Sequence, residues 1–389
     1  MNPQTISVVL PNYNDADHIG ISLKTLCEQD HPPLEVIVVD DASKDNSVEI
    51  IKNFSVLYPC IRLFRNETNR GVCGSINKGI KLATGNYIHV ATANDYILPG
   101  LFRKSISLLS RYPEAGLSFS NTSEANNETG TINHEHTWLP NKGFISSSEL
   151  ADIAHATRHP LCLGVSGSLI RRDLVLRYQS FIPELGPLAD WFLCLVVALR
   201  HGVCYVPEIL AVVNSSNTRY SYKIWHDHMR FKQICTKLFQ LLASSGYEDI
   251  TPLVIRCHSL CTLAPWGREP SVVFNALRKM SNHNRHTGKL LSHLTGWYIY
   301  GVFSRHTVPG PGVLKLLTMK MAPICNSFIT AAYYLQNVFD RVYARSFHEY
   351  DRVRSRVFKH LHKGKKRQKS ADNPCNQNIA CENPKPRQG

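Results

Sequence analysis

The sequence predicts an α/β fold in which a mainly parallel sheet is covered by helices on both faces, followed by a smaller helical C-terminal region. Three features carry this prediction. Residues 5–100 alternate between apolar runs typical of buried strands and segments whose apolar residues recur at helical spacing. Polar clusters follow the apolar runs, where ligands of such sheets bind. From about residue 225 the helical spacing continues with little strand pattern.

The first hundred residues fit this alternation segment by segment. Runs rich in Val and Ile predict strands, and the segments between them have apolar residues three or four positions apart. Ser43 or Asp45 is a suitable N-cap for the second helix, and Gly85 closes the third. Strands are expected at 6–11, 34–41, 61–66 and 86–92, and helices at 15–29, 43–58 and 71–84.

After residue 100 the alternation loosens. The patterns predict helices at 101–112 and 188–202, and strands at 115–120, around 164–174 and at 203–213, with an amphipathic helix over 226–246. We therefore expect three parts: a domain over 1–222 that carries the strand ends, a helical domain over 223–350, and a basic, largely disordered tail over 351–389.

The charge of the chain is unevenly distributed. The formal net charge is +14, and residues 340–369 hold eleven Lys and Arg against three acidic residues. Such a block favours a polyanionic partner, either an anionic lipid surface or nucleic acid. A nucleic-acid partner is disfavoured, because no reader motif and no interleaved aromatic residues accompany the charges. The twelve cysteines have no framework spacing and no signal peptide is visible, which favours reduced thiols in the cytoplasm.

Two acids, Asp40 and Asp41, follow the second predicted strand. An acid here can hold the ribose of a dinucleotide, but that site also needs a glycine-rich first turn, and the sequence has "PNYNDAD" instead. The first turn offers Tyr13 and Asp15, and an aromatic ring with carboxylates suits stacking and hydrogen bonding to a nucleobase and ribose. The alternative for Asp41 is a helix N-cap or an Asx turn.

Four segments resemble, in order and spacing, the family-2 inverting glycosyltransferases with a GT-A fold: "SVVLPNYND", "EVIVVDDASKDNS", "NRGVCGSINKGIKLATGNYI" and "ATANDYILPG". The resemblance covers roughly residues 5–215, and "LADWFLCLVVALRHG" is similar to the acceptor-side helix of the family. It implies transfer of a sugar, from a UDP-sugar by expectation, to a hydroxyl of a glycan or lipid-linked acceptor.

The resemblance also implies roles by position. It places Pro11, Tyr13 and Asp41 at the nucleobase with Asp15 and Asp40 near base or ribose, Arg70 near the pyrophosphate, Thr92 in the donor pocket, Asn94 and Asp95 at the metal, Asp190 as general base and Trp191 as an acceptor platform. The chemistry agrees, because inverting transfer needs a carboxylate to accept the proton of the attacking hydroxyl and a cation to stabilise the departing diphosphate. The alternative for Asp190 is a favourable charge in the first helical turn, and for Trp191 it is core packing.

Two positions depart from the family pattern. Asn94 stands where the family has a metal-binding carboxylate, and Ala189 stands where a second acid often precedes the base. Since Mg²⁺ and Mn²⁺ prefer carboxylate oxygen, we expect weak metal binding completed by the diphosphate. The departures leave open a second interpretation, a relative that binds nucleotide sugars or glycans without turnover and serves a partner protein.

The C-terminal third suggests attachment to a membrane surface. Residues 321–339 carry no charge but are too polar for a spanning helix, and 296–303 are aromatic and apolar. An interfacial helix followed by the basic block predicts a cytoplasmic protein held peripherally at the inner face of a cell membrane, where envelope glycans are built. The alternative is a buried helix of a small helical domain, followed by a solvated basic tail.

Overall fold

The computed structural model describes residues 4–257, apart from 127–130, 135–138, 140–142, 158–160, 162, 215–220, 222–223, 225–226 and 243. The described residues all belong to one compact unit, Met1–Thr307, and the second unit, Val308–Gly389, lies outside them. The basic block and the apolar segments at 296–303 and 321–339 also lie outside the described residues.

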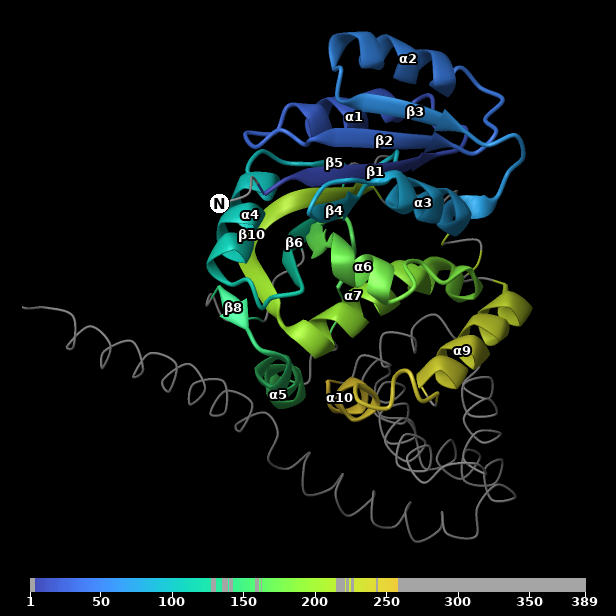
Figure 1. Ribbon diagram of the computed structural model, residues 1–389. Coiled ribbons are helices and arrows are strands. Elements are labelled where there is room, and N and C mark those ends of the chain that lie inside the picture. The colour runs from blue at the N-terminus through green and yellow to red at the C-terminus, as the bar shows by residue number, and fades with distance from the viewer. Residues whose placement is uncertain are drawn as a thin grey trace, which may run out of the picture. The chain divides into compact units, whose positions relative to one another are not determined.

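The alternation predicted for the first hundred residues is confirmed (Figure 1). Each strand begins and ends within a few residues of its apolar run, because the run is the part that both faces of the sheet bury. The order is β1 (Ile6–Asn12), α1 (Ile19–Cys27), β2 (Glu35–Asp40), α2 (Ser47–Leu57), β3 (Ile61–Arg65), α3 (Gly71–Leu82) and β4 (Tyr87–Val90).

The second part of the described chain contains more elements than the sequence patterns predict. The short strands, the helix α5 and the 3-10 helix η1 have no clear signal in the sequence. The order is β5 (Tyr96–Ile97), α4 (Leu101–Arg111), β6 (Leu117–Asn126), β7 (Thr131–His134), β8 (Phe144–Ile145), α5 (Ser147–Thr157), β9 (Ser168–Arg171), α6 (Arg172–Arg177), η1 (Pro183–Leu188), α7 (Ala189–His201), β10 (Val203–Asn214), α9 (His228–Leu242) and α10 (Thr251–Arg256).

The described strands form one mixed sheet in the order β3-β2-β1-β4-β9-β6-β10-β5, with β7 beside β6 and β8 beside β10. Strands β3, β2, β1 and β4 are parallel, and β10 is parallel to β6, whereas β9 and β5 run antiparallel to their neighbours. Asn12 is paired with Asp40 in the register of β1 and β2. The carboxyl ends of β1, β2 and β4 therefore lie along one edge of the sheet.

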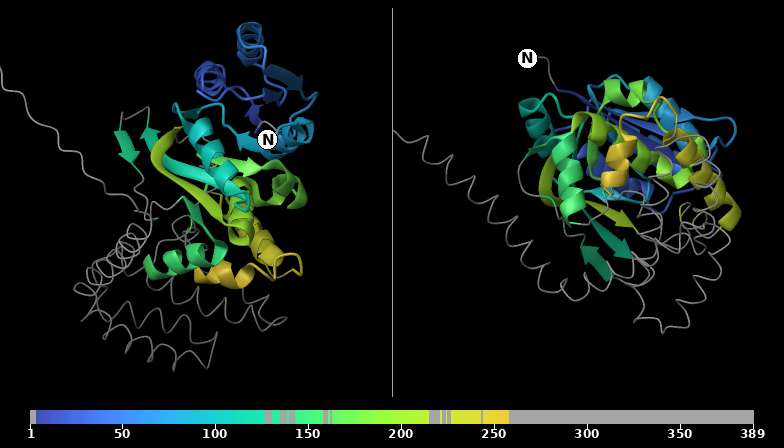
Figure 2. Two further views of the ribbon diagram at one scale, coloured as in Figure 1. Left: turned by 60° about the vertical axis from the view of Figure 1, so that its left-hand side comes forward. Right: turned by 90° about the horizontal axis from the view of Figure 1, so that it is seen from below.

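Both faces of the sheet are covered, as the sequence predicts (Figures 1 and 2). Successive residues of β1 enter different cores, because side chains alternate across a strand. Val8 and Leu10 pack with α1, α2 and α4, while Val9 packs with α3 and α7. Gly79 lets α3 approach the sheet closely, since a Cβ added there would lie 2.5 Å from a methyl group of Val9.

The helix α2 begins at Ser47, and Asn46, which precedes it, makes no capping hydrogen bond with its side chain. Of the two predicted capping residues, Asp45 accepts from the N–H of Ser47 at 3.1 Å, while Ser43 makes no recorded bond to the helix backbone within the described residues. Both also bond to the loop that follows β1: the Ser43 hydroxyl accepts from the N–H of Asn14, and Asp45 accepts from the N–H of Ala16.

Helices α9 and α10 pack onto the same core as α7, through Phe231, Leu238 and Val254 among others. The domain boundary at residue 222 remains a prediction. None of the helices in the described ranges combines the length and apolar character needed to cross a membrane.

Candidate active site

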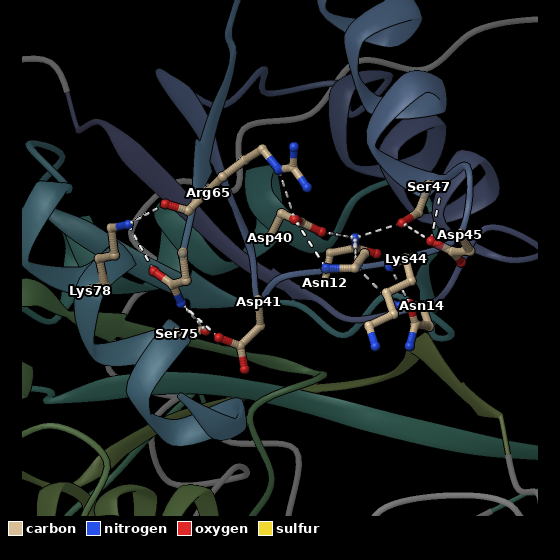
Figure 3. A network of polar contacts seen from close by, with 12 residues as sticks. Asn12, Asn14, Asp40, Asp41, Lys44, Asp45, Ser47, Arg65, Ser75 and Lys78 are labelled. Atoms are coloured by element: carbon tan, nitrogen blue, oxygen red, sulfur yellow. Dashed lines mark hydrogen bonds and ion pairs between the residues drawn. The ribbon is translucent and has the colours of Figure 1, made fainter. Parts of the chain in front are cut away.

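The loops after β1 and β2 are joined by a polar network (Figure 3). The buried side-chain amide of Asn12 lies 2.9 Å from Asp40 Oδ1, 3.1 Å from Ser43 Oγ and 3.0 Å from Ser47 Oγ. Asn14, whose φ is 54°, accepts a hydrogen bond from the backbone N–H of Lys44. A left-handed residue is unfavourable for most side chains and tolerated by Asn. These contacts fix the two loops relative to each other.

Asp40 is enclosed by this network, and its carboxylate has no exposed surface. Oδ1 accepts from Asn12, while Oδ2 accepts from the backbone N–H of Ser43 and lies 3.1 Å from Nε of Arg65. Both oxygens are therefore occupied inside the protein. This placement speaks against direct contact of Asp40 with a nucleotide and favours a role in holding the two loops.

Asp41 points toward the other side of the sheet, to the beginning of α3. Its Oδ1 accepts hydrogen bonds from the side-chain amide of Asn66 at 2.7 Å and from the backbone N–H of Arg70 at 2.9 Å. Asn66 also donates to Ser75 of α3. Figure 3 shows the second oxygen, Oδ2, without a dashed line, and no hydrogen bond to it is recorded among the described residues.

The first loop presents exposed groups at the same edge. The ring of Tyr13 is 48% exposed, which is unusual for an aromatic side chain. Asp15 follows it, and burial raises the pKa of its carboxyl above the usual 3.8, despite a hydrogen bond from the backbone of Tyr13. Pro11 is partly buried, and the side chain of Arg70 is exposed. An open aromatic face and an exposed guanidinium suit a base and a phosphate group.

The turn after β4 is held by buried contacts. Ser22 of α1 donates to backbone carbonyls of the turn, including that of Ala93 at 2.8 Å. The carboxylate of Asp95 is mostly buried and accepts from the N–H of Asn214 at 2.9 Å and from Ser166 Oγ at 3.2 Å. The Thr92 hydroxyl is buried and has no partner among the described residues. It lines a small cavity with Asp95 and Ser166.

This arrangement limits what the turn could offer to a metal ion. Among the described residues there is no grouping of three or more His, Cys, Asp or Glu suited to a cation. The side chain of Asn94 is partly exposed, without a recorded hydrogen bond in the part of the chain described. Asp95 already holds two donors. On the protein side the turn therefore offers the neutral amide of Asn94 and a carboxylate that is already hydrogen-bonded, whereas Mg²⁺ and Mn²⁺ prefer carboxylate oxygen.

Asp190 lies in the first turn of α7, and Oδ1 accepts from the N–H of Trp191 at 2.7 Å. Burial raises the pKa of this carboxyl from 3.8 to about 6, although backbone hydrogen bonds from Trp191 and Asp190 itself act in the opposite direction. A carboxylate that titrates near neutral pH is suited to accept and release a proton.

Asp190 lies near the first turn of helix α3. Cys73, in the first turn of α3, is buried, and its thiol contacts the carbonyl oxygen of Gly186 in η1 at 3.9 Å. Burial and, to a smaller extent, the charge of Asp190 raise the pKa of Cys73 to about 11. The backbone N–H of Arg70, at the start of the same helix, bonds to Asp41. Arg70, which contacts Asp41, and Cys73, which lies near Asp190, are therefore about one helical turn apart.

Trp191 occupies the core instead of an open surface. Its side chain is 6% exposed, and the indole N–H donates to the carbonyl oxygen of Leu161 at 3.2 Å. An acceptor platform needs an open ring face, so this placement speaks against the acceptor role and favours core packing.

Several polar residues of the site do not stand out in the sequence. Asn12, Ser22, Asn66 and Asn214 hold the loops or the turn through amide and hydroxyl groups. Asn12 and Asn66 carried a signal, because each stands in a polar cluster at the end of an apolar run. The others follow from the pairing of segments that are far apart in the chain.

A mainly parallel sheet with polar loops after β1 and β2 defines an α/β protein of the class that binds ligands at its strand ends. Comparison with known proteins identifies the family. Residues 7–172 match the family model "Glycosyl transferase family 2". The chain carries a glycosyltransferase family 2 domain.

Two curated proteins are similar to parts of the chain. MT1568 of Mycobacterium tuberculosis is 29% identical over 213 residues, which are 53% of this chain and 66% of that protein. YibD of Escherichia coli, a glycosyltransferase by name, is 35% identical over 103 residues, 26% of this chain and 30% of that protein. This chain therefore spans about a third to two thirds of the length of these relatives.

A mannosyltransferase from Pyrobaculum calidifontis, PcManGT in complex with GDP-Man and Mn²⁺, has a similar fold. The TM-score is 0.50 at 17% sequence identity, over 77% of this chain and 82% of that structure. At this identity the likeness concerns the fold.

Proposed function

We propose that this chain is an inverting glycosyltransferase that moves a sugar from a nucleotide-diphosphate sugar to a hydroxyl group of an acceptor, with Asp190 as the general base. The observation that carries the proposal is the placement of Asp190: burial raises its pKa to about 6, and it lies near the first turn of α3, whose start binds Asp41. The family match supports the same reaction class.

The donor nucleotide would lie across the ends of β1 and β2. Tyr13 is exposed for stacking on the base, with Pro11 and Asp15 beside it in the same loop. Oδ2 of Asp41 can accept a hydrogen bond from a ring N–H of the base, since the recorded donors bind Oδ1. The exposed guanidinium of Arg70 can pair with the diphosphate. A uracil base, and hence a UDP-sugar, is the first donor to test.

The reaction would proceed in one displacement. The acceptor oxygen forms a bond to the anomeric carbon as the bond from that carbon to the diphosphate oxygen breaks. The leaving diphosphate takes the bonding electron pair, and Asp190 takes the proton of the acceptor hydroxyl. Near neutral pH most Asp190 is deprotonated, as a base must be, since its pKa is about 6.

A divalent cation would assist the departure of the diphosphate by neutralising its charge. Asn94 and Asp95 would hold Mg²⁺ or Mn²⁺ only weakly, because the amide of Asn94 carries no charge and the carboxylate of Asp95 already accepts hydrogen bonds from Ser166 and Asn214. Arg70 contributes positive charge at the same place without a metal. The acceptor is proposed as a glycan or a lipid-linked sugar.

The proposal is tested by titrating UDP, GDP, CDP and dTDP with and without Mn²⁺, followed by transfer assays with the matching sugar nucleotides. We expect one nucleotide to bind preferentially and its sugar nucleotide to be turned over. Binding without turnover on any acceptor would favour the second candidate, a nucleotide-sugar or glycan-binding relative that acts through a partner protein. That candidate is favoured by the neutral Asn94 and by the two hydrogen bonds to Asp95.

A further inference from the structure

Helix α3 makes a second attachment, through Asn77, to the segment that precedes α7. Asn77 bonds to both backbone groups of Phe181: its amide nitrogen donates to the carbonyl at 2.7 Å, and its amide oxygen accepts from the N–H at 2.9 Å. A side-chain amide that satisfies both groups of one residue acts like a neighbouring strand. The contact joins residues that are 104 positions apart in the chain.

The segment that Asn77 holds has a strained backbone. Gln179 and Ser180, directly before Phe181, have φ values of 66° and 55°. Two consecutive left-handed residues other than glycine cost on the order of 1–2 kcal/mol each. Ser180 is also held on its own side, by its N–H bond to the carbonyl of Val175 at 2.9 Å. Contacts before and after these two residues offset the cost of the strained turn, and Asn77 supplies the contacts after it, at Phe181.

The same segment leads directly to Asp190. After Phe181 the chain forms η1, which contains a kink at Gly186 with φ 51° and ψ −126°, and α7 then begins at Ala189. Cys73 contacts the carbonyl of Gly186 at this kink. Cys73 and Asn77 are four residues apart on α3 and therefore lie on one face of the helix. This face holds the segment 181–186 at two points.

We propose that Asn77 is a positioning residue, which fixes the segment carrying Asp190 at a set distance from the donor nucleotide. The inference rests on the proposed function. Helix α3 can set this distance because its other contacts hold it against the sheet. The N–H of Arg70 bonds to Asp41, Ser75 bonds to Asn66, and Gly79 packs directly on Val9. A shift of the 181–190 segment would therefore change the position of the base relative to a bound donor.

The test compares Asn77→Ala with Asn86→Ala in the full chain. Asn86 is a matched control, since its amide oxygen also joins distant segments, accepting from the N–H and hydroxyl of Thr5, but at the opposite ends of the strands. In Asn77→Ala we expect kcat for sugar transfer to fall about 10- to 100-fold, with the donor KM within twofold of wild type. We expect Asn86→Ala to keep both values. Equal kcat losses in both variants, or a rise in donor KM alone, would overturn the inference.

A second measurement does not depend on turnover. Cys73 is 6% exposed beneath the 181–190 segment, so its alkylation by iodoacetamide, followed by peptide mass spectrometry, reports release of that segment. We expect alkylation at least tenfold faster in Asn77→Ala and unchanged in Asn86→Ala. Faster alkylation of Asn77→Ala, with no transfer by the wild type, would support the hold of Asn77 on the 181–190 segment and refute the proposed function. Unchanged protection of Cys73 in Asn77→Ala would refute the hold of Asn77 on that segment.

Discussion

Replacing Asp190 by Asn should abolish turnover while stabilising the fold at neutral pH. The amide cannot accept the proton of the acceptor hydroxyl, and loss of a general base typically lowers the rate by 10² to 10⁴. The stability effect has a separate cause. Burial raises the pKa of Asp190 from 3.8 to about 6, so the folded protein disfavours the charged carboxylate that it contains at pH 7.

The size of the stability effect follows from this pKa. A rise from 3.8 to about 6 corresponds to about 3 kcal/mol, since each pH unit is worth about 1.4 kcal/mol. The sign is that of a raised carboxyl pKa: the folded state binds more protons than the unfolded state between pH 4 and 6. The unfavourable contribution is therefore absent below pH 4, grows as the pH rises to 6, and is complete at pH 7. The amide variant lacks it, and we expect its gain to reach at most about 3 kcal/mol.

The assay is urea denaturation of wild type and Asp190→Asn at pH 4.5 and 7.5, with donor binding measured alongside. We expect a higher midpoint for the variant at pH 7.5, a much smaller difference at pH 4.5, and an unchanged nucleotide affinity. Asp173→Asn is the control of opposite sign, because hydrogen bonds from Arg171 lower the Asp173 pKa in spite of partial burial. A variant that is less stable than wild type at pH 7.5 would refute the assignment of a raised pKa to Asp190, and full turnover would refute its role as base.

Three further substitutions test the site and the fold. Gly79→Ala should cost about 1–2 kcal/mol in urea denaturation, because its Cβ would lie 2.5 Å from the stiff side chain of Val9; Gly164→Ala, with nothing within 4 Å, should cost little. Arg70→Ala should raise the donor KM about tenfold in steady-state kinetics and leave the fold intact, because the exposed side chain is lost while the backbone N–H of residue 70 remains. Asn94→Asp should lower the Mn²⁺ concentration needed for half-maximal activity in a metal titration, since carboxylate oxygen is the better ligand; an unchanged requirement would place the cation elsewhere.

The order of β1 to β4 and of the intervening helices could be predicted because buried parallel strands leave continuous apolar runs in the sequence. The strands β5 and β8 have two residues each, too few to establish a period, and their pairing with β10 depends on the folded chain. The helix α5 was not predicted from the sequence, because its polar and apolar residues are interspersed without a clear apolar stripe at helical spacing.

Within the site, charge type was easier to predict than orientation. Asp190 could be named because its helix resembles the acceptor-side helix of the family, and the structure adds the burial that raises the pKa of its carboxyl. Trp191 stands next to it, and the sequence alone could not decide between core and acceptor surface, because an aromatic ring fits both. The bond from its indole N–H to Leu161 depends on a loop that no local pattern specifies.

Asp40 and Asp41 are adjacent at the end of β2, but their side chains have different surroundings. Asp40 stabilises the loops, whereas Asp41 is the one proposed to bind the nucleotide. Consecutive side chains of a strand point to opposite faces, so the two carboxylates cannot share partners. Asp40 turns toward the loops after β1 and β2, where both of its oxygens are bonded, and an uncompensated buried charge there would be costly. Asp41 turns toward α3 with one oxygen bonded to that helix. Under the proposed function, the contacts of Asp40 keep the loop backbone in place, and the remaining oxygen of Asp41 is the one that accepts a hydrogen bond from the nucleotide.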